Sequence, residues 1–551
     1  MRSAYGWVVV IFVSLFVAHA CGYLFGVANQ NTYFLHALQH AHPELYRHDW
    51  LVSSTTGYHA VFSFFAGQLF ALDDSGATVF AIVHVVLMVV LSCGVFLVIR
   101  GTTTRGALAI FVLVMGWLVV SGERSMAGSY VWSGYLQPSL IGAAGWIIAL
   151  AMYVRGRPLA TGIALAAGGI FHVNFLILGI GAFALVELIV EREQRGKRLA
   201  LLLAPQLVAL AILLPELLSN LGSSDPQRAL WVLVEFHAPI HYKPIWVVRE
   251  LPNMLCWAAL AVVVAPVASA YGTRPAVRRL LWWSVIVAAI CALGTLIMLV
   301  PGLLSLTRLY VWRLAPFAIL AAQIVIALAL AASVADVRTW LGQPRWRRIA
   351  ALGLLAWIVA SKWLLKSGEV EPALWIAALA IAVAIVVPQD RRQALFAIGA
   401  VITLALPVWS RHEEMLRPRV AVESEGVDGD ALYAWVGAHT SVDAVFLTSP
   451  DMGRFRFTAR RAIYADFKSP PLEGDSLVEW HARLRRMTGA APTDKVPAQR
   501  AAWRGATGDE VLARSKELGV DYLVLDRSQA HDRIAARPVF SNASFAVYAI
   551  R

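Results

Sequence analysis

Residues 77–99 read ATVFAIVHVVLMVVLSCGVFLVI, a run without Asp, Glu, Lys or Arg that ends at Arg100. A helix rises about 1.5 Å per residue, and the hydrocarbon core of a bilayer is about 30 Å thick. A helix over this run is therefore long enough to cross a membrane. Similar runs recur along the first 409 residues, so the sequence predicts a protein with many transmembrane helices.

The composition of the whole chain excludes an ordinary soluble protein. Of its 551 residues, 59% are hydrophobic and only 15% are charged, whereas soluble domains carry about 25% charged residues. The mean hydropathy is +0.64. Most of the chain therefore needs lipid as its solvent, and its 20 Trp residues fit the aromatic belts of a membrane protein.

Apolar runs predict about thirteen transmembrane helices in a domain over residues 1–409. A further apolar run, 55–72, is interrupted by Gly57, His59 and Gln68, and we expect it to be interfacial or re-entrant. The predicted spans are 5–27, 77–99, 106–121, 135–154, 158–173, 174–191, 199–217, 252–270, 280–303, 308–333, 349–365, 371–387 and 393–409.

Lysine and arginine are distributed unevenly among the loops between these spans. With the N-terminus inside, the inside loops carry 18 Lys or Arg, whereas the longer outside loops carry 7. This is the positive-inside pattern. It predicts a cytoplasmic N-terminus, outer loops over 28–76 and 218–251, and a C-terminal domain over 410–551. In a bacterium this places the protein in the inner membrane with the C-terminal domain in the periplasm.

Several classes of function are excluded by the same distribution. Residues 410–551 carry 20 Lys/Arg against 19 Asp/Glu, so the net charge of +12 comes from membrane loops and nucleic-acid binding is excluded. The four cysteines all lie in apolar runs, which leaves no disulfide framework. The sequence has no Gly-rich phosphate loop, so ATP is excluded as a direct substrate.

The C-terminal domain is predicted to be a small α/β fold. Residues 473–487 and 508–518 have helical patterns, and Gly519 is placed to end the second helix. Short apolar runs between turn residues predict strands at 444–448, 462–467, 522–525 and 545–550.

The first outer loop opens with Asn29-Gln30, has Tyr33 three residues after Gln30, and later reads His48-Asp49-Trp50. Together with the many spans and the C-terminal outer domain, this pattern resembles the GT-C superfamily of membrane glycosyltransferases. In the protein-mannosyl and aminoarabinose-transferase branches, the loop opens with Asp-Glu, a Tyr follows three residues later, and Gly-Asp-Trp comes after it. The resemblance implies transfer of a sugar from a polyprenyl-phosphate or polyprenyl-diphosphate carrier at the periplasmic face.

The chain departs from that pattern at its first two positions. Asn29-Gln30 stands where the acidic pair is expected, and an amide cannot take a proton from an acceptor hydroxyl. Asp49 is then the predicted catalytic base, with a helix N-cap or an ion pair with Arg47 as its structural alternatives. Tyr33 and Asn29 are predicted to contact the substrate.

The chain also resembles uncharacterised bacterial polytopic proteins with a C-terminal periplasmic domain and the same Asn-Gln opening. That resemblance covers most of the chain but brings no known reaction. The matching C-terminal residues here are Trp435, Arg461, Asp466-Phe467-Lys468 and Glu479-Trp480.

Two arginines at the start of the tenth predicted span, Arg308 and Arg313, are predicted to bind the donor phosphate. Arg313 is expected about one and a half turns inside the membrane, where an unpaired charge is costly. Guanidinium groups bind phosphate through bidentate hydrogen bonds, whereas snorkelling to lipid headgroups is the alternative. Arg124, in the second outer loop, and His172, near the apex of a predicted hairpin, complete the substrate site.

A divalent cation is a further expectation. Glu123 is predicted to hold Mg²⁺ or Mn²⁺ together with Asp49, so that the metal bridges the donor phosphate. An interfacial ion pair between Glu123 and Arg124 is the alternative.

The leading hypothesis is a GT-C-type glycosyltransferase that acts on a polyprenyl-phosphate-linked sugar. The alternative is a non-catalytic lipid- or glycan-binding protein of the same fold, which the Asn29-Gln30 departure favours. A transporter or lipid flippase is a third hypothesis, but it predicts internal repeats, and the two halves of the sequence show none.

Overall fold

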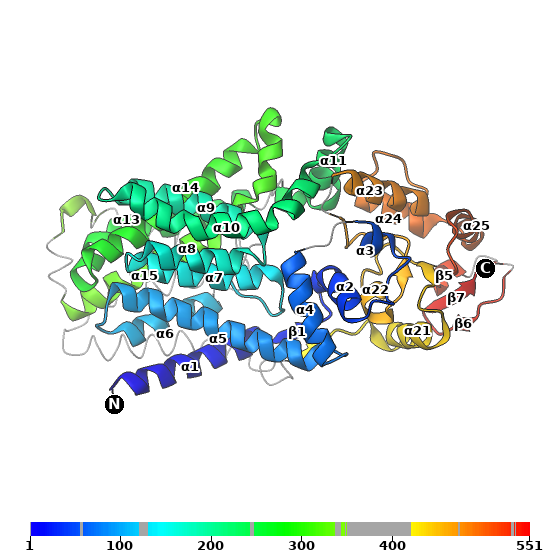
Figure 1. The fold of residues 1–551 in the computed structure, drawn as a ribbon, viewed down its shortest axis with the longest axis horizontal. Coiled ribbons are helices and arrows are strands. Elements are labelled where there is room, and N and C mark those ends of the chain that lie inside the picture. Colours follow the sequence, from blue (N-terminus) through cyan, green and yellow to red (C-terminus); the bar gives the residue numbers. More distant parts are fainter. Residues whose placement is uncertain are drawn as a thin grey trace.

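The computed structural model describes residues 2–55, 59–120, 131–242, 247–336, 343–347, 349, 420–471, 474–530, 534 and 536–551. The boundary between the two predicted domains and, apart from residue 349, the last three predicted spans lie outside these residues. So do Glu123 and Arg124. Figure 1 shows long, side-by-side helices at one end of the molecule and a smaller α/β part at the other.

The helical end is built from apolar helices. By length and composition, six helical segments of the described chain can cross a membrane, and five shorter apolar helices accompany them. This confirms an α-helical polytopic membrane protein, and the number thirteen stays a prediction. The helices of this end are α1 (Arg2–Cys21), α5 (Ala77–Thr102), α6 (Ala107–Val120), α7 (Pro138–Val154), α8 (Pro158–Gly169), α9 (Val173–Val190), α10 (Arg195–Leu221), α13 (Val247–Tyr271), α14 (Arg274–Ile297) and α15 (Ala315–Ala335).

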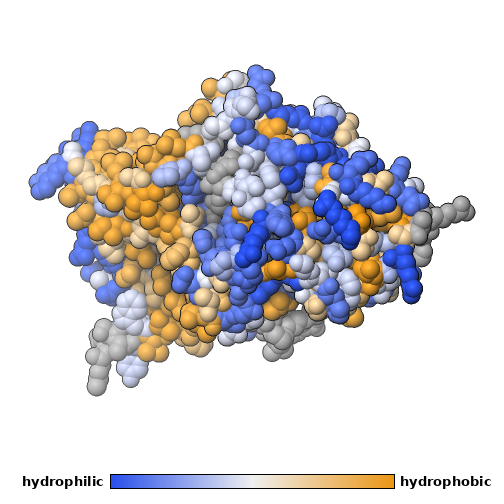
Figure 2. All heavy atoms as spheres, turned by 45° about the vertical axis from the view of Figure 1, so that its right-hand side comes forward, coloured by the Kyte–Doolittle hydropathy of each residue, from blue (hydrophilic) through white to orange (hydrophobic). Residues whose placement is uncertain are grey.

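The outward-facing side chains at this end are apolar. Val86, Val208, Ile212, Leu293 and Leu296 are each more than half exposed. Figure 2 shows hydrophobic residues gathered over the helical end and hydrophilic residues over most of the other end. A soluble monomer rarely exposes an apolar surface of this extent, so lipid is the natural solvent of these helices.

The predicted hairpin over 158–191 is present as α8 and α9. α8 ends at Gly169 and α9 begins at Val173, so His172 and Asn174 lie at the turn, as the sequence predicted. The turn lies at the end of the helices that faces the C-terminal domain, which we call the outer end (Figure 1).

The chain between α14 and α15 differs from the prediction. A single helix was expected from residue 308, but two 3₁₀ segments, η3 (Pro301–Leu309) and η4 (Val311–Leu314), come before α15. Tyr310 separates them with a φ of +48°, and Pro316 starts the α-helix in its first turn. Arg313 therefore precedes the α-helix, but it still falls within Gly302–Ala335, a helical stretch long and apolar enough to cross a membrane. Its depth inside a span stays a prediction.

The first outer loop folds over the outer end. The prediction that 55–72 is not a transmembrane span agrees with the 13 residues of its helix, which is about 20 Å long. Its elements are β1 (Tyr23–Phe25), α2 (Gln30–Ala41), α3 (Trp50–Ser54) and α4 (Ala60–Leu72). The outer loop over 218–251 forms α11 (Pro226–Trp231), a π-helical turn η2 (Val232–His237) and α12 (Pro239–Tyr242).

The C-terminal domain is an α/β fold, as predicted. Its five-stranded sheet has the order β4-β3-β5-β7-β6, in which β4, β3 and β5 are parallel and β7 and β6 are antiparallel to their neighbours. The strands are β3 (Val445–Leu447), β4 (Ala462–Ile463), β5 (Tyr522–Asp526), β6 (Phe540–Ser541) and β7 (Phe545–Ala549). The helices are α21 (Gly426–His439), α22 (Phe455–Ala459), α23 (Gly474–Thr488), α24 (Val496–Gly505), α25 (Gly508–Leu518) and α26 (Arg527–Ala530).

A short pair of parallel strands joins the first outer loop to the start of the C-terminal domain. β1 follows α1 directly and pairs with β2 (Val420–Val422), which leads into the C-terminal domain. The Glu423 amide continues the ladder by donating to the Phe25 carbonyl oxygen at 2.9 Å. The first outer loop is thereby fixed to the C-terminal domain.

Candidate functional site

A guanidinium and an imidazole meet at the outer end of the membrane helices. Arg313 Nη1 donates to His172 Nε2 at 3.0 Å, which requires that this nitrogen carry no proton. Asn174 Nδ2 donates to the Leu309 carbonyl oxygen at 2.7 Å and so fixes the hairpin turn against η3. Two residues that the sequence predicted for substrate binding, Arg313 and His172, are therefore in direct contact.

The first outer loop adds two aromatic rings to this contact. The His59 ring lies 4.4 Å from the His172 ring, and the Tyr33 ring lies 5.3 Å from His59, both measured between centroids. Burial, with the Arg313 charge as a smaller cause, lowers the pKa of His59 to about 3. Burial raises the pKa of Tyr33, and the Arg313 charge partly opposes this. Both side chains are therefore neutral at physiological pH.

The outer loop over 218–251 brings His241 and Tyr242 beside Tyr310. Tyr310 Oη lies 3.1 Å from His241 Nδ1, and the guanidinium carbon of Arg313 lies 4.7 Å from the centre of the Tyr310 ring. Burial raises the pKa of the neighbouring Tyr242 to about 12, again against the Arg313 charge. We call this group of six side chains the Arg313 cluster: Tyr33, His59, His172, His241, Tyr310 and Arg313.

The positive charge of the Arg313 cluster has no ion-pair partner in the described part of the chain. Among the described residues, no carboxylate forms an ion pair with Arg313. Its Nε atom is buried and has no hydrogen-bond partner there. A buried charge is stable only when it is paired, and a guanidinium pairs best with a carboxylate or phosphate. The arrangement is therefore suited to binding an anion.

The side chain of Arg308, in η3, is exposed, and its positive charge acts on Tyr242 beside the cluster. Asn29 serves another purpose: it accepts a hydrogen bond from Lys468 Nζ at 2.7 Å. Gln30 accepts from the Gly26 amide at 2.9 Å and donates to the Leu136 carbonyl oxygen at 3.0 Å. The amide pair that replaces the expected acidic pair thus holds the start of the first outer loop in place.

Asp49 is fully buried between the first outer loop and the C-terminal domain. One carboxylate oxygen caps α3 by accepting from the Leu51 amide at 3.0 Å and from the Val52 amide at 3.3 Å. The other accepts from Arg456 Nε at 2.7 Å and from the Ile463 amide at 3.1 Å. Asp49 therefore caps a helix, as the structural alternative predicted. It also forms an ion pair, but with Arg456 and not with the predicted Arg47. Neither oxygen is open to an acceptor hydroxyl.

The predicted metal site is not tested by the described residues. Among them, no group of three or more His, Cys, Asp or Glu side chains is arranged to hold a metal ion. Glu123 lies outside them, so its role as a metal ligand stays a prediction.

His59 and Tyr310 are not predicted from the sequence as site residues, and Arg456 is predicted only as part of a basic face or as a phosphate contact, not as the partner of Asp49. His59 interrupts an apolar run and by itself indicates only that the run is not a span. Arg456 lies in a basic segment of the C-terminal domain. Nothing in the local pattern distinguishes such residues from solvated ones, because their partners lie far away in the sequence.

Comparisons with known proteins give one short family match and several structural likenesses. The family described as "Domain of unknown function (DUF6798)" matches residues 427–487, a range that includes Arg456. No curated protein matches this chain.

The structural likenesses include two proteins whose structures have been solved. The oligosaccharyltransferase AglB from Archaeoglobus fulgidus, solved with an inhibitory peptide and a dolichol-phosphate, is 11% identical, with 95% of this chain and 70% of that chain covered and a TM-score of 0.49. ArnT from Cupriavidus metallidurans in the apo state is 14% identical, with 100% and 98% covered and a TM-score of 0.48. The ArnT structure bound to undecaprenyl phosphate has the same identity and coverage and a TM-score of 0.43.

Proposed function

We propose that this chain binds a polyprenyl-phosphate-linked sugar at the outer end of its membrane helices and transfers the sugar to an acceptor. The observation that carries the proposal is the partly buried guanidinium of Arg313. Its buried Nε has no hydrogen-bond partner and the guanidinium has no carboxylate partner among the described residues, and it lies against a neutral His172. The first-loop pattern that resembles GT-C glycosyltransferases supports the same class of ligand.

The position of Arg313 favours a phosphate that belongs to a lipid. Arg313 directly precedes α15, whose residues are almost all buried and apolar, so an anion beside it lies next to the membrane helices. Arg313 also falls within Gly302–Ala335, a stretch long and apolar enough to cross a membrane, which favours a lipid as the source of the phosphate. Arg308, exposed on the preceding 3₁₀ segment, adds positive charge at the approach to the site.

Non-catalytic binding of the same lipid is the second candidate function. It is favoured by Asp49, whose two oxygens accept four hydrogen bonds inside the protein, and by Asn29-Gln30. We propose that Asp49 stabilises the contact between the loop and the C-terminal domain and is not the base. Catalysis would then take its base from another residue.

The test is lipid capture by the purified full-length protein in mild detergent, read by native mass spectrometry. We expect the wild-type protein to retain a polyprenyl phosphate or its sugar adduct. The Arg313→Ala variant should retain at least about tenfold less of this lipid, because a hydrogen bond to a charged group contributes about 1.5–3 kcal/mol. Arg308→Ala is the matched control and should lose less.

Equal capture of bulk phospholipid by all three proteins, with no polyprenyl phosphate, would refute the proposal. If wild type does retain the lipid, incubation of that complex with candidate acceptors separates the two functions. Release of the sugar shows a transferase, whereas an unchanged adduct shows a binding protein.

A further inference from the structure

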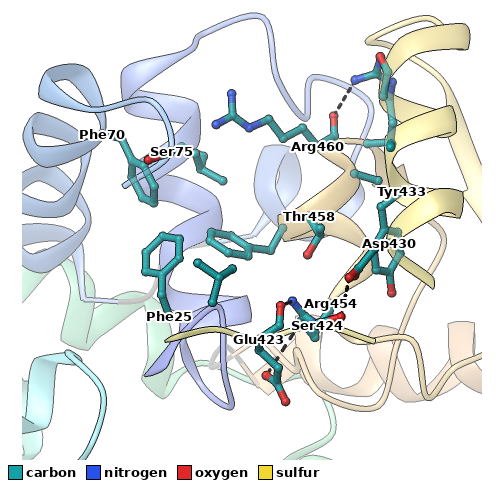
Figure 3. Close-up of a pocket in the computed structure, with 17 residues that line it drawn as sticks. Phe25, Phe70, Ser75, Glu423, Ser424, Asp430, Tyr433, Arg454, Thr458 and Arg460 are labelled. Carbon is teal, nitrogen blue, oxygen red and sulfur yellow. Dashed lines mark hydrogen bonds and ion pairs between the residues drawn. The ribbon is translucent and has the colours of Figure 1, made fainter. Parts of the chain in front are cut away.

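A cavity of about 620 Å³ lies between the first outer loop and the C-terminal domain. Phe25, Phe70 and Ser75 line it from one side, and residues of β2, α21 and α22 line it from the other (Figure 3). Ligand-binding pockets commonly measure about 300–1,000 Å³ and lie between domains. The cavity shares no residue with the Arg313 cluster.

One wall of this interdomain cavity is aromatic. The ring centres of Phe25 and Phe70 are 6.5 Å apart, and Phe457 lies 5.5 Å from Phe25 and 6.4 Å from Phe70. Phe25 comes from β1, Phe70 from α4 and Phe457 from α22. Phe25 and Phe70 are only 3% and 2% exposed, so the half-buried Phe457 presents most of this apolar surface to the cavity, with the other two rings packed behind it.

The other walls carry positive charge that is incompletely paired. Arg454 is only 7% exposed; its Nη2 donates to the Glu423 carbonyl oxygen, but its Nε and Nη1 have no hydrogen-bond partner. The Glu423 carboxylate lies 3.9 Å from that Nε, too far for a hydrogen bond. In Figure 3, Arg454 lies at one end of the cavity and Arg460 at the other.

Arg461 adds a second buried guanidinium to the cavity lining. Its hydrogen bonds run to the Thr440 hydroxyl and to the carbonyl oxygens of Gly437, Thr440 and Arg460. All of these acceptors are neutral, so the charge of Arg461 is not cancelled by them. The lining carries Arg454, Arg460 and Arg461 against the carboxylates of Glu423 and Asp430, so positive charge is in excess there.

We propose that this cavity binds an acidic sugar, a monosaccharide unit that carries a carboxylate or phosphate. The apolar face of the sugar ring lies against Phe457, which Phe25 and Phe70 support from behind, and its anionic group accepts hydrogen bonds from the free N–H groups of Arg454. The exposed Thr458 hydroxyl is placed to bond a sugar hydroxyl, and Asp430, which already accepts a hydrogen bond from Ser424, can accept a further one. Because both halves of the molecule line the cavity, the bound sugar links the first outer loop to the C-terminal domain.

The experiment measures binding of methyl β-D-glucuronide to the full-length protein by isothermal titration calorimetry. The detergent must have no sugar headgroup, so that it does not occupy the cavity. Methyl β-D-glucoside, the neutral counterpart, and inorganic phosphate are the comparison ligands. We expect the glucuronide to bind at least about tenfold more tightly than either, since charge-assisted hydrogen bonds are about twice as strong as neutral ones.

Two variants test the site independently. Arg454→Gln removes the anion partner and should weaken glucuronide binding about tenfold or more. Thr458→Trp fills the cavity from an exposed position on α22 and leaves Arg454 in place, so it should abolish binding even if Arg454→Gln folds poorly.

Arg486→Gln, at a half-exposed arginine on α23, is the control and should bind as wild type does.

Three results would overturn the proposal. They are no glucuronide binding by wild type, equal binding of the glucoside or of phosphate alone, and glucuronide binding that survives Thr458→Trp unchanged. None of these bears on lipid capture at Arg313, so the two proposals stand or fall separately.

Discussion

Asp49 and Asp466 share one guanidinium at the contact between the first outer loop and the C-terminal domain. Arg456 donates to both carboxylates, and all three side chains are buried. Burial raises the pKa of Asp466, although the Arg456 charge and two backbone amides oppose the rise. Trp480 Nε1 donates to the Asp466 carbonyl oxygen at 2.9 Å and so ties α23 to the same point. At the scale of single residues, this group is what holds the loop to the domain.

Asp49→Asn should therefore lower stability more than activity. Asn can still cap α3 through its side-chain oxygen, but it leaves Arg456 with one carboxylate in place of two. Breaking a buried ion pair costs about 3–5 kcal/mol, which thermal unfolding in detergent will detect. Glu44→Gln, at a half-exposed carboxylate in the same loop, is the control and should change little. An Asp49→Asn protein with unchanged stability and no transfer would instead restore Asp49 as the catalytic base.

His59 makes the stability of the outer end depend on pH. Its pKa is lowered from 6.5 to about 3 in the folded protein, so below pH 6.5 the unfolded chain binds a proton that the folded chain does not. The free energy of unfolding is therefore unaffected by the titration of His59 above pH 6.5. It falls by about 1.4 kcal/mol per pH unit as the pH is lowered from 6.5 toward 3.

His59→Asn removes this titration while keeping a residue that tolerates the left-handed backbone at this position, where φ is +49°. Unfolding measured at several pH values should show a shallower loss of stability with acid for the variant than for wild type. Parallel curves for the two proteins between pH 6.5 and 4 would contradict the buried, neutral state of His59.

At the scale of elements, α7 and α8 depend on glycine for their close contact. A Cβ on Gly168 would lie 2.8 Å from the Gly145 Cα and 3.1 Å from the Gly142 carbonyl oxygen. These contacts are to backbone, which cannot move aside without separating the helices. Small residues at such crossings let membrane helices pack closely without a hydrophobic driving force. The contact also positions the turn after α8, where His172 meets Arg313.

Gly168→Val should destabilise the protein by about 1–3 kcal/mol, the usual cost of overpacking, and should reduce lipid capture because the hairpin turn moves. Gly181→Ala is the matched control: nothing lies within 4 Å of its new Cβ, and alanine favours the α9 helix. Thermal unfolding in detergent should separate the two variants clearly. Equal stability of both would show that α7 and α8 are not in backbone contact.

At the scale of the whole molecule, contacts distant in sequence join the membrane helices, the first outer loop and the C-terminal domain. Thr32 and Ser469 share a hydrogen bond of 2.9 Å, and Tyr46 Oη donates to the Arg456 carbonyl oxygen at 2.7 Å. Arg460 Nη1 donates to Asp74 at 2.8 Å. Both proposed sites lie on this outer side of the molecule, so the orientation in the membrane decides which compartment supplies their ligands.

The charge bias of the loops predicts that the C-terminal domain is outside. Alkaline phosphatase fused after Arg551 should be active, and green fluorescent protein fused there should be dark, because each reporter folds on one side only. Fusions after Gln194, in the Arg-rich loop between α9 and α10, should give the opposite pair of results. The reverse pattern at both positions would invert the predicted topology.

The sequence by itself determined the membrane character, the α8–α9 hairpin and the main strands and helices of the C-terminal domain. These features follow from composition and short-range periodicity, which each segment carries independently of its neighbours. Composition and periodicity do not determine where a helix begins. The sequence predicts a helix from residue 308, whereas α15 begins at Ala315, because the chain first turns at Tyr310.

Only the tertiary structure decided which polar side chains meet. Arg313 pairs with His172 at a separation of 141 residues, and Arg456 pairs with Asp49 at a separation of 407. Asp49, the predicted catalytic base of the first outer loop, forms an ion pair with Arg456 of the C-terminal domain. Arg313, in contrast, contacts the neutral side chain of His172. Such pairings depend on how whole elements pack, and a local pattern of residues carries no record of them.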